Sequence, residues 1–273
     1  MPTVSIITAV HARGAAFLDE TTASVAAQQL PTGWHLEWLV QEDSSEPMLA
    51  ERFQAVDFAN YDAVGMQLGI AATRNLALAR ASGDVVQVLD ADDLLLPGAL
   101  ARLVRAFDDP SIHWAVGQAD DLMPDGSRVS WDSAMPYGVL KAGAINKWAE
   151  ANGANWPIHC AGLMIRTTSL RALGGWVGLP HDEDVAMFAA LSEVTDGQNV
   201  DQVTWLYRQH PGQVTREKST RHVVTETRRY AMQRAVAARL AGQRLSDAAP
   251  LGAHRGAHLV DVGPSLKQNR PAI

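Results

Sequence analysis

The sequence predicts an α/β fold in which helices cover a doubly wound, mostly parallel sheet. Short β-branched runs alternate with segments of helical periodicity over roughly the first 115 residues, as is typical of such sheets. Two of the predicted strands end in acidic turns, at the sheet edge where ligands of these folds bind. With 273 residues, of which 47% are hydrophobic, the chain can bury the core that this fold needs.

The first predicted elements are a strand, a helix and a second strand. The run VSIIT at 4–8 is short and β-branched, as expected of a buried parallel strand. Residues 17–29 place apolar side chains on one side of a helix. EWLV at 37–40 predicts the second strand, which we expect to end in the polar turn QEDSSEP. The stretch that follows carries no clear pattern.

A second helix and a third strand come next. Apolar residues at helical spacing run from 68 to 79, and Gly83 stands just past the end of that helix, where glycine is common. VVQVL at 85–89 predicts the third strand. Pro97 opens a further helix, because proline is favoured in the first helical turn. WAVG at 114–117 predicts the fourth strand, which completes the alternating part of the chain.

Beyond residue 117 the alternation weakens. Residues 118–156 carry turn signals such as PDG and PYG. We expect a strand at 160–166, a helix with an acidic start at 182–191, and a strand running into a turn at 203–212. These elements predict that the chain returns to the same core.

The C-terminal region is predicted to be one long helix and a tail. Residues 216–244 contain eight Lys or Arg against two Glu. We expect this helix to pack against the rest of the protein with its basic face solvated. The alternative is that this helix binds an anionic membrane or a partner. The predicted organisation is therefore three regions, 1–117, 118–215 and 216–273.

Composition and charge exclude several classes of protein. A net charge of −7 argues against general nucleic-acid binding. Cys160 is the single cysteine, so an intrachain disulfide framework and a multi-cysteine metal site are excluded. We find neither a signal peptide pattern nor an apolar window long enough for a membrane span. We therefore expect a cytoplasmic protein without a membrane span, and a homodimer is compatible with the sequence.

The acidic turn QVLDADDLL carries the main functional signal. Asp90, Asp92 and Asp93 follow a strand directly, and such a cluster repels itself unless a cation, amide donors or solvent compensates it. Hard cations such as Mg²⁺ and Mn²⁺ take oxygen ligands, commonly one or two carboxylates together with phosphate oxygens. The alternative is that Asp92 or Asp93 caps the next helix.

The segment from Gly69 to Leu100 resembles the central segment of the family 2 glycosyltransferases. In that family, a helix with an Ala-Arg-Asn-like element leads through Gly-Asp into a strand that ends in Asp-x-Asp. The resemblance extends over about residues 3 to 215 in the family's order. The matching pieces are the opening VSIIT with Ser24-Val25 and Gln28, the turn 41–45, Thr73-Arg74-Asn75, Gly83-Asp84, Asp90-Ala91-Asp92-Asp93, Glu183-Asp184, and the YRQHPG run at 207–212.

The resemblance implies a GT-A fold and an inverting glycosyltransferase that moves a sugar from a nucleotide diphosphate to an acceptor hydroxyl. Region 1–117 would bind the nucleotide-sugar. Region 118–215 would bind the acceptor and carry catalysis, and region 216–273 would add the C-terminal helix and tail.

The implied chemistry needs a cation and a base. The resemblance implies Mn²⁺ or Mg²⁺ held by Asp90 and Asp92, with His210 as a third ligand or a pyrophosphate donor; otherwise His210 is a loop residue. A carboxylate within reach of the acceptor hydroxyl would take its proton. Asp184 is our first choice for this base and Glu183 the second. The alternative for both is favourable charge at a helix N-terminus.

The resemblance also implies contacts to the donor, which we expect to be a UDP-sugar. Glu42 and Asp43 would accept a hydrogen bond from the base. Arg74 would contact the base or a phosphate, unless it is an exposed helical arginine. Asp84 would contact the base or ribose, unless it binds backbone at the helix end. The implied donor-binding set is Thr8, Glu42, Asp43, Arg74, Asp84, Asp90, Ala91 and Asp92.

Other α/β enzyme classes fit less well. A dinucleotide-binding oxidoreductase would show G-x-G-x-x-G after the first strand, and a P-loop enzyme would show G-x-x-x-x-G-K-[ST]; the chain has neither. Two alternatives stay open: a metal-dependent nucleotidyltransferase, and a non-catalytic nucleotide-sugar binding protein on the same fold. The sequence does not identify the acceptor or the donor sugar.

Overall fold

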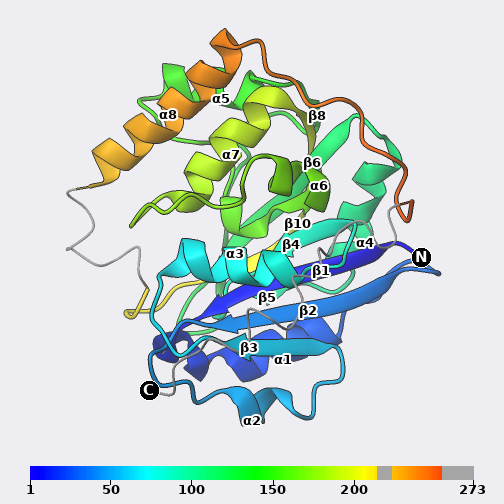
Figure 1. Cartoon of the computed structure of the whole chain (residues 1–273), viewed down its shortest axis with the longest axis vertical. Helices are drawn as coiled ribbons and strands as arrows, with labels where there is room; N and C mark the ends of the chain where they lie inside the picture. Colours follow the sequence, from blue (N-terminus) through cyan, green and yellow to red (C-terminus); the bar gives the residue numbers. More distant parts are fainter. Residues whose placement is uncertain (214–222, 254–273) are drawn as a thin grey trace, which may run out of the picture.

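The computed structural model describes residues 1–213 and 223–253, and it contains one ten-stranded sheet with helices on both faces (Figure 1). The strand order is β3-β2-β1-β4-β9-β6-β10-β5, with β7 on β6 and β8 on β10. The longer strands pair in parallel, whereas the short ones pair antiparallel. The predicted mostly parallel α/β sheet is confirmed.

The N-terminal half of the sheet is wholly parallel. Strands β1 (Thr3–Val10), β2 (His35–Glu42), β3 (Ala59–Ala63) and β4 (Val85–Val88) make it up, with β1 between β2 and β4. Because the strands are parallel, the turns that follow β2 and β4 lie at the same edge of the sheet.

The other half is mixed. β6 (Ile112–Leu122) and β10 (Asp196–Arg208) are long and parallel to each other, and β9 (Met164–Arg166) joins β6 to β4 in antiparallel pairing. Since β6 crosses residue 117, the sheet is continuous between the two halves that the sequence suggests. The remaining short strands are β5 (Leu94–Leu95), β7 (Arg128–Ser130) and β8 (Gly138–Leu140).

Helices pack against both faces and form two cores. One buried cluster lies under α1, α2 and α4, and a second lies under α3, α5, α6 and α7. The α-helices are α1 (Leu18–Ala26), α2 (Ala50–Phe53), α3 (Ile70–Arg80), α4 (Ala99–Leu103), α5 (Ala144–Ala151), α6 (Thr167–Ala172), α7 (Glu183–Val194) and α8 (Val224–Leu240), and short 3-10 turns span Ala12–Ala16, Val104–Asp108 and Cys160–Gly162.

The structure corrects three element predictions. Strand β2 continues through Gln41 and Glu42, which the sequence places in a turn, because both residues are buried and pair with β1 and β3. The unpatterned stretch contains β3, an edge strand with the sequence ANYDA. β10 begins seven residues before the expected 203, through a polar segment that pairs with β6. Pairing partners, which no local pattern encodes, decide all three.

The C-terminal helix packs inward. α8 lies alongside α7 at the top of the molecule in Figure 1, and four alanines form their contact: Ala186 and Ala189 of α7, with Ala231 and Ala235 of α8. The predicted helix at 216–244 lies partly outside the described residues, and so does most of the predicted tail. The arginines of the described part point to partners within the protein, among them Glu226, Glu193 and the carbonyl of Ala186.

Candidate active site

The acidic turn after β4 is held in shape by its backbone. The N–H of Asp93 bonds back to the carbonyl of Asp90, and the hydroxyl of Thr21 donates to the carbonyls of Ala91 and Asp93. Asp93 itself is fully buried, and its Oδ1 accepts the N–H of Arg208 at 2.9 Å. This arrangement turns Asp93 into the sheet and leaves Asp90 and Asp92 half-buried at its edge.

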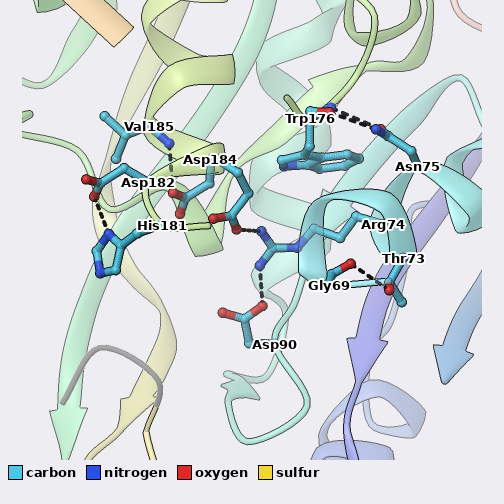
Figure 2. Close-up of polar contacts among 11 residues, drawn as sticks. Gly69, Thr73, Arg74, Asn75, Asp90, Trp176, His181, Asp182, Asp184 and Val185 are labelled. Carbon is cyan, nitrogen blue, oxygen red and sulfur yellow. Dashed lines mark hydrogen bonds and ion pairs between the residues drawn. The ribbon is translucent and has the colours of Figure 1, made fainter. Parts of the chain in front are cut away.

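Arg74 connects the acidic turn to the start of α7. Its Nη2 lies 2.6 Å from Oδ1 of Asp90 (Figure 2), and its Nη1 lies 2.8 Å from Oε1 of Glu183. The side chain is buried, and its guanidinium carbon lies 5.8 Å from the centre of the Trp176 ring. Arg74 is therefore not the exposed helical arginine that the sequence leaves open. It brings together two acidic elements that are far apart along the chain.

The local structure of α3 explains how Arg74 reaches both acids. Gly69 precedes the helix with a φ of 85°, a conformation that favours glycine, and the Thr73 hydroxyl bonds back to the Gly69 carbonyl. Asn75 fixes the opposite side by donating to the carbonyl of Trp176 and accepting its N–H. The Thr-Arg-Asn element thus orients Arg74 through its two neighbours, and Asn75 is a supporting residue that the sequence analysis did not assign.

Asp92 and His210 form a second contact at the same edge. Nε2 of His210 lies 2.8 Å from Oδ2 of Asp92, and the imidazole packs against the ring of Phe17 with centroids 4.6 Å apart. Burial raises the pKa of Asp92, the charge of Asp90 adds to this, and His210 opposes it. Burial also raises the pKa of Asp93 well above its ordinary value, with further contributions from Asp90 and Asp92.

These residues fit a divalent cation in combination with a substrate. Asp92 and His210 contact each other directly, and Oδ2 of Asp93 is buried without a hydrogen-bond partner among the described residues. Within those residues no group of three or more His, Cys, Asp or Glu side chains is placed so that it could hold a metal ion by itself. A set of one or two carboxylates with an imidazole leaves coordination positions for phosphate oxygens, as Mg²⁺ and Mn²⁺ sites commonly do.

The acid pair opens α7. Glu183 and Asp184 occupy its first turn, where carboxylates are favoured by the helix dipole. Burial raises the pKa of Glu183 to about 7, the charge of Asp184 contributes, and Arg74 opposes the shift. Asp184 is half-buried, and its Oδ1 accepts the N–H of Val185 at 2.7 Å (Figure 2). Glu183 is thus engaged with Arg74, whereas Asp184 is the more accessible of the two.

Glu42 and Asp43 are occupied by the protein itself. The carboxylate of Glu42 accepts the N–H groups of Met48 and Leu49 and the hydroxyl of Tyr61. Asp43 accepts the N–H groups of residues 68 and 69, just before α3. The two carboxylates organise the loops that surround the sheet edge, and the sequence analysis did not foresee this use of them.

Three other residues predicted to contact the donor have internal partners. Thr8 is fully buried, donating to the carbonyl of Leu89 and accepting from the indole of Trp38. Ala91 is buried within the acidic turn. Asp84 directly precedes β4, at the opposite end of the strand from Asp90, and its carboxylate accepts the N–H groups of Thr3 and Gly252. The structure does not bring Asp84 to the site.

Comparison with known proteins identifies the family. The model of glycosyl transferase family 2 matches residues 5–172, which is more than half of the chain. The chain belongs to this family. Residues 183–213, with the acid pair and His210, lie beyond the matched segment.

The family 2 chain also resembles curated proteins over part of its length. It is 34% identical over 136 residues to the O-antigen biosynthesis protein RfbC of Myxococcus xanthus, a match to 46% of this chain and 10% of RfbC. It is 40% identical over 60 residues to the uncharacterized protein MT1568 of Mycobacterium tuberculosis (strain CDC 1551 / Oshkosh), covering 20% of this chain and 19% of that protein. The matched segments span less than a fifth of either relative.

Solved structures extend the likeness to nearly the whole fold. S. aureus TarS 1-349 in complex with UDP superposes with a TM-score of 0.64 at 15% identity, covering 90% of this chain and 68% of that one. The complex of TarS 1-349 with UDP-GlcNAc gives 0.60 at 16% identity, covering 78% and 60%. At such identities the likeness concerns the fold, and together with the family match it confirms the expected GT-A fold. In the part of the chain that the structure describes, no helix has the length and hydropathy needed to cross a bilayer.

Proposed function

We propose that this family 2 glycosyltransferase transfers a sugar from a UDP-sugar to an acceptor hydroxyl with inversion at the anomeric carbon. The observation that carries the proposal is the buried Arg74, which joins Asp90 of the acidic turn to Glu183 beside the candidate base. The solved complexes of TarS with UDP and with UDP-GlcNAc support the choice of nucleotide.

The donor's diphosphate belongs at the acidic turn. Asp92 and His210, with Asp90 beside them, would hold Mn²⁺ or Mg²⁺ there, and the cation would offset the charge that develops on the departing diphosphate. Arg74 keeps Asp90 in place and compensates its charge. The protein's own contribution is to keep these oxygen and nitrogen ligands half-buried, where electrostatic interactions are stronger than in water.

Asp184 would act as the base. Its half-buried carboxylate can accept the acceptor's proton while the hydroxyl attacks the anomeric carbon from the face opposite the diphosphate. Glu183 would hold Arg74 instead of taking the proton, since its carboxylate already contacts the guanidinium. We assign the role of base to Asp184 because the carboxylate of Glu183 is already bound to Arg74.

The test combines donor turnover with donor binding. The wild-type protein should release UDP from at least one of UDP-GlcNAc, UDP-glucose and UDP-galactose in the presence of Mn²⁺, and EDTA should stop the release. Asp184→Asn should bind UDP as tightly as wild type in calorimetry yet lose turnover by about 100-fold or more. The exposed Asp125→Asn, on the turn before β7, is the matched control and should leave both unchanged.

Two outcomes would contradict the proposal. If Asp184→Asn abolishes UDP binding, this carboxylate is a donor-side or structural group. If no UDP-sugar turns over while UDP-sugars still raise the melting temperature, the protein is a nucleotide-sugar binder on the same fold.

A further inference from the structure

The residue before the acid pair has an unusual conformation. Asp182 precedes α7 with φ 55° and ψ 27°, in the left-handed region that non-glycine residues rarely adopt. An aspartate at this position ordinarily accepts an N–H of the first helical turn, but the Asp182 side chain makes no such bond. Something other than helix capping therefore keeps this carboxylate in place.

The C-terminal helix supplies that partner. Thr227, in the first turn of α8, donates its hydroxyl to Oδ2 of Asp182 at 2.6 Å, and both residues are buried. Nε of Arg228 lies 3.8 Å from the same oxygen, and Nδ1 of His181 lies 3.1 Å from Oδ1 (Figure 2 shows the His181 contact). The carboxylate of Asp182 is thus drawn toward α8 and away from the helix that it precedes.

The helix that holds Asp182 is itself firmly attached to α7. The alanine contact between α7 and α8 lets the two backbones approach closely, and Arg234 donates to the carbonyl of Ala186 at 3.0 Å. Farther along, Arg239 makes two hydrogen bonds to Glu193 near the end of α7. Both ends of α7 are bound to α8. The helix α7 therefore cannot slide along α8 to compensate for a displacement of Asp182.

We propose that Thr227 is a positioning residue for the glycosyl transfer. By holding Asp182 in its left-handed conformation, it sets the direction in which the next two side chains, Glu183 and Asp184, leave the start of α7. The inference rests on the proposed function, in which Asp184 is the base. It assigns a catalytic contribution to α8, which lies outside the segment matched by the family model.

The experiment compares Thr227→Val with Thr227→Ser in Mn²⁺-dependent UDP release from the UDP-sugar that wild type turns over. Valine keeps the branched shape but lacks the hydroxyl, so kcat should fall by about 10- to 100-fold, as expected for a small misplacement of a reacting group. The KM for the donor and the Kd for UDP should stay at the wild-type values. Serine keeps the donor and should restore kcat to within about threefold.

A second variant tests the same interaction in case Thr227→Val does not fold. Glycine can adopt the left-handed conformation without strain, so Asp182→Gly should fold. It is not confined to that conformation, and without the carboxylate nothing ties it to Thr227, so kcat should fall to the same extent as in Thr227→Val. The double variant should lose no more than either single one, because both changes remove one interaction. Arg229→Ala, on the exposed side of α8 with Glu226 as its partner, is the control and should be fully active.

The outcomes separate the inference from the function on which it rests. Full kcat in a folded Thr227→Val, or equal losses in the valine and serine variants, overturns the positioning role while leaving the proposed function in place. A loss of UDP binding in step with kcat overturns it as well, since that indicates a general structural role. Wild-type protein without turnover overturns the proposed function and this inference together.

Discussion

Two acidic turns lie at the same edge of the sheet and use their carboxylates differently. At the end of β2, Glu42 and Asp43 accept backbone N–H groups, so their charge is compensated by the loops that they organise. After β4, Asp90 and Asp92 face side chains, Arg74 and His210. A backbone amide is fixed in place by the fold, whereas an arginine or histidine can change partner when a ligand arrives.

The difference separates structural acids from acids available to a ligand. A carboxylate that satisfies several buried N–H groups cannot be withdrawn without leaving those donors unpaired. A carboxylate in an ion pair at the sheet edge can exchange its partner for a cation or a phosphate-bound cation at lower cost. The comparison therefore predicts that substitutions in the first turn reduce stability, and that substitutions in the second reduce activity.

The largest expected effect is on catalysis. Asp92→Asn removes a carboxylate that we propose as a metal ligand, and Mn²⁺-dependent UDP release should fall by about 100-fold or more. The melting temperature without metal should change little, because asparagine can still bond to His210. Full activity with Mn²⁺ in this variant would remove the metal from the proposed function.

The second effect is on stability. Glu42→Gln replaces one carboxylate oxygen by an NH2 group, which cannot accept a hydrogen bond. In one orientation this group faces the N–H of Met48, which Oε1 accepts, and in the other it faces the N–H of Leu49 and the hydroxyl of Tyr61. The free energy of unfolding in urea should fall by about 1–3 kcal/mol. The turnover of the remaining folded enzyme should stay close to wild type. A stable but inactive variant would instead place Glu42 among the donor-binding residues.

A smaller effect concerns pH. Burial raises the pKa of Asp93 above its ordinary value, so between the unfolded and folded pKa values the folded state binds the extra proton. The contribution of Asp93 to the stability of the metal-free protein should therefore be greatest on the acidic side of that window and fall as the pH rises through it. Asp93→Asn should flatten this dependence, measured as the free energy of unfolding in urea over a series of pH values. An unchanged slope would show that Asp93 is not the group responsible.

The smallest effect tests an acid outside both turns. Asp84 lies at the far end of β4 and accepts the N–H groups of Thr3 and Gly252. Asp84→Asn should leave kcat and the donor KM within about twofold of wild type, with only a modest loss of stability. A large rise in the donor KM would return Asp84 to the donor site, where the family resemblance places it.

Local patterns predicted most of the fold but not its irregular parts. The β-branched runs at 4–8 and 85–89 become β1 and β4, and the acidic start at 182 marks the beginning of α7. Strand β3 was missed because ANYDA contains no β-branched residue and is defined only by its pairing with β2. An edge strand of this kind depends on its neighbour for its conformation.

The site shows the same division. The order of motifs predicted the residue types at the sheet edge, and the structure brings Asp90, Asp92 and His210 there with Arg74 and Glu183. The order of motifs could not predict that Arg74 is buried between two acids, nor that the Glu42 carboxylate accepts backbone N–H groups. Such partners come from distant segments, and no spacing rule connects them.

By itself, the sequence determined the α/β class, the family and the acidic turn after β4, because short-range periodicity and a fixed order of motifs carry that information. The tertiary structure alone decided which acids have partners that can be exchanged. It also decided that Thr227 of α8 holds Asp182, its partner from 45 positions earlier in the chain. The physical reason is that charge compensation and burial depend on neighbours in space, and the fold chooses those neighbours.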